Sequence, residues 1–441
     1  MRFFHISDLH IGKQLYHYSL KEAQQAILEQ IVERVREYRP DALLIAGDIF
    51  DKSVPSGEAY LLFDAFLDQL AEVEPQVPVL AVAGNHDSGE RLQYAASFLE
   101  KQQIHIAAFP PDEEGERLKK VTLEDPFGPV DIYLLPFTKP SYVRHLFPEG
   151  KAVSYDEAVG AVLEREDLDL TRRNVLLSHQ FYVSGSQRPF VSASEQGYLT
   201  HGGGQTAEAE AFLPISVGGI DSVDVSRVRR FDYVALGHLH GAQWIGRPEV
   251  RYCGTPLKYS VSEEKQEKSI TLVTLGAKGA EVKIETIPLK ARQDVRTERG
   301  TLEEVIGCAE RRIKEKGTAC RGRECAGEGM PEEDRRAAGE QGPGVAAMEK
   351  EDDFVSITLT DEKELFCPRE RLEEHYSHIL EVRVDNSRTR ARLQAGVDGP
   401  VTLDPMELFR RFYQEMQGCL MSREEEEILG DVIKKAEEEE G

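Results

Sequence analysis

Short runs of apolar, β-branched residues recur along the chain, and each run ends abruptly in Gly, Asp, Asn or His. Runs of this length, bounded by turn-forming residues, are typical of strands buried inside a sheet. The strands predicted on this basis are Phe3–Ile6, Ala42–Ala46, Val79–Ala83, Val175–Leu177 and Tyr233–Leu236.

Two helices are predicted between the first of these strands. The segment Ser19-Leu-Lys-Glu22 has the form of a capping box, which predicts a helix from there to about Tyr38 with one apolar face. The segment Glu58–Leu70 is apolar nearly all round. A helix of that kind is buried on two sides, which predicts contacts with both the core and another subunit.

A change of character near Lys290 predicts the end of a first domain. Before it, strands are expected at Arg251–Cys253, Ile270–Leu275 and Val282–Ile287, the last two as a hairpin. After it, a helix at Leu302–Lys316 precedes the stretch Gly317–Lys350, which has almost no large apolar residue and predicts a disordered insertion. Strands at Phe354–Leu359 and Ile379–Val384, a helix at Pro368–His375 and two helical stretches within Pro405–Glu440 complete the prediction.

Composition and net charge exclude few classes of function. The 441 residues are 40% hydrophobic and 30% charged, which is typical of a globular protein of more than one domain. The net charge of −25 argues against nucleic acid at first sight, but residues 301–441 hold 35 acidic against 21 basic side chains. Much of the negative charge therefore lies away from the first domain, and a nucleic-acid substrate remains open.

The sequence also predicts a location. No apolar run is long enough to span a membrane, and the first residues, which reach Asp8 and His10 at once, do not form a signal peptide. The six cysteines are scattered without a metal-binding spacing, so free thiols in a reducing compartment are expected. A cytoplasmic protein is the prediction.

Five polar motifs follow directly after predicted strands. Because active sites gather at the carboxyl ends of strands in α/β folds, residues spread over more than two hundred positions are expected to converge. The motifs are Asp8-Leu-His10, Gly47-Asp48-Ile-Phe-Asp51, Gly84-Asn85-His86-Asp87, Ser178-His179 and Gly237-His238-Leu-His240.

The residue types predict metal-dependent cleavage of a phosphodiester. Two divalent ions roughly 3.5–4 Å apart activate a water and stabilise the charge on the phosphoryl and leaving oxygens. Imidazole mixed with carboxylate favours transition ions over magnesium alone. Asp48, which follows a glycine, is the natural carboxylate to bridge both ions. Taken singly, each motif is weak, and a turn or a satisfied core histidine explains it as well; the ordered set of five is what indicates a site.

The order of motifs resembles the calcineurin-like metallophosphoesterase superfamily. Within it, the chain is similar to the SbcD family, the bacterial nuclease partners of the SbcC ATPase. Four segments carry this second resemblance: the start Phe3-Phe-His-Ile-Ser-Asp-Leu-His-Ile-Gly-Lys13, then Gly84-Asn-His-Asp-Ser-Gly-Glu-Arg-Leu92, Phe231-Asp-Tyr-Val-Ala-Leu-Gly-His-Leu-His240 and Gly254-Thr-Pro-Leu-Lys-Tyr-Ser260. The resemblance covers residues 1–290 and is loose beyond them.

The resemblance implies a role for each site residue. One ion is expected on Asp8, His10, Asp48 and His240, and the other on Asp48, Asn85, His179 and His238. His86 would face the scissile phosphate as proton donor or charge stabiliser, with Asp87 orienting its imidazole. Asp51 falls near the substrate, and the alternative for it is a carboxylate in the first turn of a helix.

The resemblance also implies an architecture and an activity. The expected fold is α/β: a four-layer α/β/β/α core at 1–290, a small α/β cap at 291–390 interrupted by the insertion at 317–350, and a helical partner-binding tail at 400–441. A homodimer would bind two copies of an SbcC-like ATPase through the C-terminal region. Manganese-dependent exonuclease and endonuclease action on DNA ends and hairpins, in DNA repair and recombination, would follow, with magnesium as the alternative metal.

Two rival functions stay open at this stage. A stand-alone phosphatase or cyclic-nucleotide phosphodiesterase would use the same core but leaves the cap and tail unexplained. A non-enzymatic scaffold would have lost ligands, whereas each expected position keeps its side chain. ATP would act only through the partner, because the sequence has no phosphate-binding loop of the Gly-x-x-x-x-Gly-Lys-Ser/Thr type. The stretch Ser184–Leu213, with Arg188 and His201, is expected to be a long loop near the site.

Overall fold

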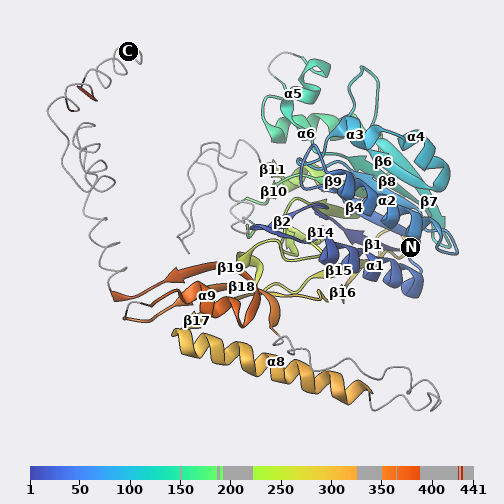
Figure 1. Ribbon diagram of the computed structural model, residues 1–441. Helices are drawn as coiled ribbons and strands as arrows, with labels where there is room; N and C mark the ends of the chain where they lie inside the picture. The colour runs from blue at the N-terminus through green and yellow to red at the C-terminus, as the bar shows by residue number, and fades with distance from the viewer. Residues whose placement is uncertain are drawn as a thin grey trace. The chain divides into compact units, whose positions relative to one another are not determined.

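The computed structural model contains two six-stranded sheets and a separate three-stranded sheet (Figure 1). It describes residues 1–148, 151–185, 189–191, 222–324, 350–363 and 365–387, together with Glu426, Leu429 and Gly430. Within the described residues, no helix is long and apolar enough to span a bilayer.

The first sheet has a parallel centre and an antiparallel edge. Strands β1, β4, β5 and β6 run parallel, while β15 pairs antiparallel with both β1 and β16. The predicted hairpin near Gly276 is therefore confirmed. In sheet order the strands are β16 (Lys283–Pro288), β15 (Ser269–Thr274), β1 (Arg2–Ile6), β4 (Ala42–Ala46), β5 (Val79–Val82) and β6 (Ile104–Ala107).

Helices connect the parallel strands and cover the outer face of the first sheet. They are α1 (Lys21–Tyr38), α2 (Gly57–Ala71), α3 (Gly89–Gln93) and α4 (Ala96–Leu99). Side chains alternate along a strand, so Phe4 packs toward these helices while Phe3 packs into the space between the sheets.

The expected capping box is wrong. Helix α1 begins only at Lys21, and Leu20 is its N-cap without a side-chain bond. Ser19 instead ends the short strand β3 (Tyr18–Ser19), which pairs with β2 (Gln14–Leu15). Ser19, which the local sequence pattern assigned to the start of the helix, is therefore paired with a strand instead.

The second sheet contains three strands that the sequence pattern missed, namely β7 (Lys119–Asp125), β8 (Gly128–Leu135) and β13 (Gln243–Ile245). β8 was hidden by its polar start and by Asp131 within its apolar run, and β7 is an edge strand with exposed charged residues. The strand β6 of the first sheet was also missed. In order, the second sheet is β13 (Gln243–Ile245), β14 (Arg247–Tyr252), β12 (Tyr233–Gly237), β9 (Arg173–His179), β8 (Gly128–Leu135) and β7 (Lys119–Asp125).

The two sheets pack face to face through a dry apolar layer. Phe3, Leu44 and Leu80 from the first sheet meet Ile132 and Leu177 from the second, all with essentially no exposed surface. Helix α6 (Tyr155–Glu164) packs on the outer face of the second sheet. This arrangement confirms the predicted α/β fold with its four layers.

The three-stranded sheet follows the core in sequence. Its order is β17 (Val295–Gly300), β18 (Glu351–Leu359) and β19 (Tyr376–Val384), accompanied by α8 (Leu302–Glu324) and α9 (Pro368–Glu373). The strands and helices predicted in this region are confirmed. Helix α8, however, continues past Lys316 to Glu324, so the start of the predicted disordered stretch is helical; residues 325–349 lie outside the described part of the chain.

The chain divides into two compact units. One comprises Met1–Thr358 with Cys367–Arg383, and the other comprises Leu359–Phe366 with Val384–Gly441. The domain boundary near Lys290 remains a prediction. Apart from Glu426, Leu429 and Gly430, the predicted tail at 400–441 lies outside the described residues.

Candidate metal centre

The predicted site residues lie at the carboxyl ends of parallel strands from both sheets. Asp8 and His10 follow β1, Asp48 follows β4, and Asn85 follows β5, all in the first sheet. His179 ends β9 and His238 follows β12 in the second sheet. Because these strands end at one edge of the sandwich, side chains that are far apart in sequence meet there.

Asp48 lies between the two groups of ligands. One of its carboxylate oxygens, Oδ2, is 3.4 Å from Nε2 of His179 and 3.8 Å from Nε2 of His10. The other, Oδ1, accepts a hydrogen bond of 2.9 Å from the backbone N–H of His86. One buried carboxylate therefore faces a histidine from each of the two expected ion sites.

Asp8 joins the two sheets at the same place. Both of its carboxylate oxygens accept from the backbone N–H of His238, at 3.0 and 3.1 Å, and the Ser7 hydroxyl donates to one of them. Ligand atoms of Asp8, Asp48 and His179 lie within 4.8 Å of one another, and so do those of His10, Asp48 and His86. Asp48 belongs to both groups, although the groups differ from the ligand sets implied by the resemblance in placing Asp8 with His179 and His86 with His10.

His10 provides a test of whether a metal fits. Its imidazole is 1% exposed, and among the described residues neither ring nitrogen has a hydrogen-bond partner. An unsatisfied buried polar group costs about 1–3 kcal/mol. A divalent ion beside Nε2 would remove that cost, so the residues present fit a metal.

Asn85 contacts the two histidines that are predicted to bind the second ion. Its Oδ1 lies 3.0 Å from Nε2 of His179 and 3.0 Å from Nδ1 of His238. Nδ1 of His179 donates to the backbone oxygen of Ala46 at 2.7 Å, so the neutral ring has its lone pair on Nε2. An amide oxygen, a carboxylate and two imidazoles thus converge, which is a donor set for a borderline transition ion.

Burial and charge shift the pKa values of these groups in opposite directions. Burial, with the charge of Asp48 beside it, raises the pKa of Asp8 to about 7. Burial would also raise the pKa of Asp48, but His179 and His86 hold it well below its usual range. Burial disfavours a charged His179, yet Asp48 outweighs it and raises the pKa of His179 to about 9.

Burial keeps two of the predicted ligand histidines neutral. Burial lowers the pKa of His238 to about 3 and holds the pKa of His10 well below its usual range. Metal ligands must be deprotonated, so both rings are ready to bind an ion at neutral pH.

The backbone at the site is strained. Asp8, His10, Asp48 and His238 have φ values of 53°, 43°, 49° and 99°, a region that residues other than glycine rarely occupy. Such conformations cost roughly 1–3 kcal/mol each and persist only where surrounding contacts hold them. Here the N–H groups of Asp8 and His10 donate to the backbone oxygens of Gly47 and Asp48, each at 3.0 Å.

Two glycines allow the strand ends to approach. A Cβ atom on Gly84 would lie 2.1 Å from Oδ1 of Asp48. A Cβ atom on Gly47, whose φ is +84°, would lie 2.3 Å from Nδ1 of His179. Any side chain at either position would displace a ligand.

Asp87 supports the loop that bears Asp48. Its carboxylate accepts three hydrogen bonds from backbone N–H groups, those of Gly84 at 2.8 Å, Ile49 at 3.1 Å and Phe50 at 2.9 Å. The expected orienting contact with His86 comes from another group, because Nδ1 of His86 donates to the backbone oxygen of Asp51 at 2.8 Å. Asp87 therefore supports the loop, and its orientation of the His86 imidazole stays a prediction.

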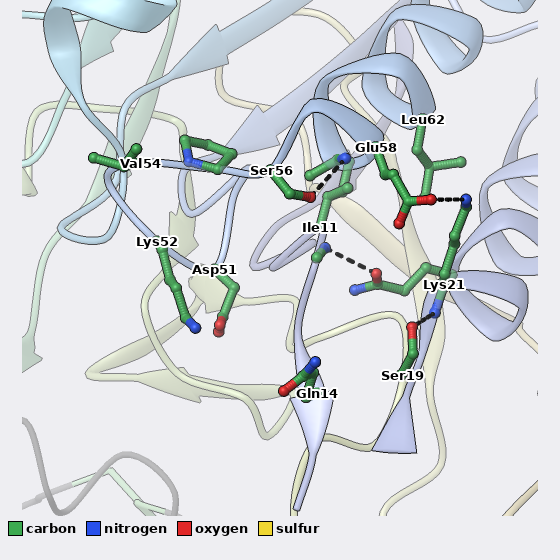
Figure 2. Close-up of a pocket in the computed structure, with 14 residues that line it drawn as sticks. Ile11, Gln14, Ser19, Lys21, Asp51, Lys52, Val54, Ser56, Glu58 and Leu62 are labelled. Atoms are coloured by element: carbon green, nitrogen blue, oxygen red, sulfur yellow. Dashed lines mark hydrogen bonds and ion pairs between the residues drawn. The ribbon is translucent and has the colours of Figure 1, made fainter. Parts of the chain in front are cut away.

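The side chain of Asp51 faces the first ion site. It pairs with Nζ of Lys13 at 2.7 Å, and its Oδ1 lies 3.8 Å from Nδ1 of His10. Helix α2 begins only at Gly57, so the alternative of Asp51 as a first-turn carboxylate is wrong. Asp51 also lines a cavity of about 390 Å³, shown in Figure 2, and it is the one predicted site residue among the lining residues. This cavity borders the site and is not the site itself.

Two supporting residues were missed by sequence reasoning. Glu263 accepts from Nδ1 of His240 at 2.9 Å, and burial opposes its ionisation although His240 and Lys268 lower its pKa to about 2. Gln24 donates from Nε2 to the backbone oxygen of His10 at 2.7 Å. A signal existed for Gln24, a polar residue on the buried face of an amphipathic helix. Arg188 and His201 of the predicted loop lie outside the described residues.

Comparisons with known proteins agree with this geometry. Residues 1–242 match the family model described as calcineurin-like phosphoesterase, and residues 291–417 match the one described as type 5 capsule protein repressor C-terminal domain. The SbcD subunit of the nuclease SbcCD from Staphylococcus epidermidis is 32% identical over 72% of this chain and 76% of its own length. The corresponding subunit from Staphylococcus saprophyticus is 31% identical over 69% of this chain and 73% of its own length.

A solved structure with some similarity is that of GAP50, the anchor in the inner membrane complex of Plasmodium. It covers 66% of this chain and 89% of its own, with 15% sequence identity and a TM-score of 0.33. A similarity at this level carries no argument about fold or function.

Replacing Asp48 by Ala is expected to abolish binding of both ions, because its carboxylate faces histidines from both halves of the site. His10→Ala is expected to weaken one ion only. Elemental analysis after equilibrium dialysis against Mn²⁺ measures the ions per chain, with Asp64→Ala on the exposed side of α2 as control. Two ions per chain in Asp48→Ala would disprove the bridging assignment.

Proposed function

Because the chain belongs to the calcineurin-like phosphoesterase family and, within it, to the SbcD nuclease subunits, we propose that the residues at the strand ends form a two-ion centre that hydrolyses DNA phosphodiesters. The observation that carries the proposal is the position of Asp48 between His10 and His179. The second matched family model, over residues 291–417, accounts for a region that a stand-alone phosphatase would leave unexplained.

The division of ligands between the two ions that we propose follows the family resemblance. We assign Asp8, His10, Asp48 and His240 to one ion, and Asp48, Asn85, His179 and His238 to the other. In support, the rings of His10 and His240 lie 5.2 Å apart, and Asn85 contacts both His179 and His238. Bound there, two ions would supply an activated water and stabilise charge on the phosphoryl oxygens.

His86 is the group that we assign to the substrate. It is more exposed than the buried ligands, and its Nδ1–H is held by the backbone oxygen of Asp51. In the ring protonated at both nitrogens, Nε2 is the one that donates a proton or a hydrogen bond to the reacting phosphate. Asp51, paired with Lys13, lies beside this position and helps to set the local charge.

Manganese is the metal we propose, with magnesium as the competitor. The family implies divalent metal, and the donor set adds the preference. Imidazole ligands suit transition ions, whereas magnesium is bound mainly by oxygen and keeps much of its water. Four imidazoles, those of His10, His179, His238 and His240, therefore weigh against Mg²⁺, and the choice of Mn²⁺ among the transition ions follows from the family resemblance.

The partner proposed is an SbcC-like ATPase, attached through the C-terminal region. Residues 405–417 and 428–433 have apolar side chains at helical spacing, and both segments fall in the part of the chain that is mostly outside the described residues. A short pair of amphipathic helices cannot build a core of its own, so it needs another surface. DNA ends and hairpins are the substrates proposed for the complex.

A homodimer is proposed through the helices on the outer face of the first sheet. Leu61 on α2, Tyr94 after α3 and Phe98 on α4 are 70%, 84% and 65% exposed. These helices cover the same face of one sheet, because each connects two of its parallel strands. Large apolar side chains grouped on one face mark an interaction surface, and a second copy of the chain is the occupant we propose.

His86→Ala is expected to keep near-normal metal content while cleavage falls by roughly 10²–10⁴-fold, the usual loss when a proton-transfer group is removed. His179→Ala is expected to lower both. The measurements are elemental analysis and cleavage of end-labelled duplex DNA with Mn²⁺ or Mg²⁺. If His86→Ala loses metal and His179→Ala does not, the two roles are reversed.

Phe98→Glu combined with Leu61→Glu is expected to convert a dimer into a monomer, because two buried charges would oppose the proposed interface. Sedimentation velocity measures the change. The control is Phe127→Glu, since Phe127 is 61% exposed in the turn after β7. Dimers of unchanged stability in the double variant would place the interface elsewhere.

Truncation after Gly399 is expected to leave a folded protein with some Mn²⁺-dependent cleavage but without a stable complex with the ATPase. Co-purification of the full and truncated chains with the partner provides the comparison. Wild-type stoichiometry in the truncated chain would exclude the tail as the main attachment.

A further inference from the structure

Glu263 lies against a predicted metal ligand without being a ligand itself. It ends the short 3-10 helix η4 (Val261–Glu263), and its side chain is completely buried. Oε1 lies 2.9 Å from Nδ1 of His240. An ionised carboxylate can only accept, so Nδ1 carries the proton, and in the neutral ring the lone pair is left on Nε2, the nitrogen available to an ion.

Lys268 keeps this carboxylate ionised. Its Nζ lies 2.7 Å from Oε2 of Glu263, and the side chain is 8% exposed. The hydroxyl of Thr255 and the backbone N–H of Tyr259 lie 3.4 and 3.3 Å from the same oxygen. A buried carboxylate that is paired and hydrogen-bonded in this way does not need to take up a proton to remain buried.

Lys268 and Thr255, which surround the Glu263 carboxylate, also hold the backbone of His240. Both Nζ of Lys268 and the N–H of Thr255 donate to the backbone oxygen of His240, at 3.1 Å each. Ring and main chain are therefore fixed together. Thr255 belongs to the segment Gly254–Ser260, one of the four segments that carry the family resemblance. Its contact with His240 gives this segment a role beside the site, although the segment supplies no predicted ligand.

Neighbouring histidines are held differently. Nδ1 of His179 donates to a neutral backbone oxygen, that of Ala46. Neither ring nitrogen of His10 has a hydrogen-bond partner in the described part of the chain. Of these three rings, His240 is the one whose Nδ1 donates to a carboxylate. A carboxylate behind a ligand histidine fixes its tautomer and increases its basicity toward a metal.

We propose that Glu263 is a positioning residue of the metal centre, which fixes the tautomer and orientation of His240 and so strengthens one of the two ions selectively. The affected ion is the one assigned to Asp8, His10, Asp48 and His240. The proposal rests on that ligand assignment. Glu263 is not among the assigned ligands, and its effect passes through the ring of His240 and, by way of Lys268 and Thr255, through the His240 backbone.

The test is calorimetric titration of the metal-free full-length protein with Mn²⁺. In Glu263→Ala, one ion is expected to bind about 10–100-fold more weakly, the usual effect of removing such a partner, while the other keeps its affinity. Glu263→Gln keeps an oxygen that accepts from Nδ1 but loses the charge, so a smaller loss is expected. Gln also keeps the shape of the side chain if Ala prevents folding.

The matched control is the next residue along the chain. Glu264 accepts from the backbone N–H of Thr297 at 3.0 Å and from its hydroxyl at 2.6 Å, so it faces β17 and not the site. Glu264→Gln is expected to leave both affinities unchanged. Thermal unfolding in EDTA measures the stability of each metal-free variant separately from metal binding.

Three outcomes would overturn the proposal. Unchanged affinity for both ions in a folded Glu263 variant would exclude a positioning role. Equal weakening of both ions, together with a lower unfolding temperature in EDTA, would show a general structural role. Equal losses in Glu264→Gln would assign the effect to the segment as a whole. His240→Ala tests the ligand assignment separately from the role of Glu263. If this variant binds both ions normally, the ligand assignment is wrong, whatever the Glu263 variants show.

Discussion

The buried carboxylate of Asp48 is the constraint on which the rest of the site depends. It is 2% exposed and lies where the edges of two sheets meet, within 4 Å of histidines from each. An unpaired charge in such a place costs several kcal/mol, so the surroundings must supply positive charge or hydrogen bonds. His179, the backbone N–H of His86 and, when present, metal ions do so.

The close approach of the two sheets requires strained backbone conformations. Asp8 and Asp48 adopt φ values of 53° and 49°, and Gly84 leaves no room for a side chain beside the Asp48 carboxylate. Hydrogen bonds between the loops hold these conformations, above all the three that Asp87 accepts from backbone N–H groups. Stability of the sandwich and order in the site are thus coupled: weakening either loop would relax the strain and separate the ligands.

The polar residues of the site differ in how far they are buried. The ligand candidates Asp8, His10 and His179 are almost fully buried, which keeps water from competing for the ions. His86 is only partly buried, as are the ligand candidates Asn85 and His238, and of these three it is the one that we propose to meet the phosphate. Behind them, a backbone oxygen at Ala46 and a carboxylate at Glu263 select which ring nitrogen keeps its lone pair. The tautomers of two predicted ligands therefore depend on acceptors that are not themselves predicted ligands.

The sequence by itself determined the apolar strands, since a short continuous apolar run such as that of β1 or β4 is a local property, and it identified the motif residues because each follows such a strand. It did not reveal β7 or β8, whose charged or mixed patterns make sense only beside a neighbouring strand. It misplaced the start of α1, because pairing of Gln14 with Ser19 is decided by the chain around them. Glu263 was beyond reach for the same reason: a carboxylate 23 residues after His240 becomes its partner only once the fold has turned the chain back. Local patterns fix which residues are apolar or reactive, whereas burial and partners are set by contacts between distant segments, and those only the tertiary structure decides.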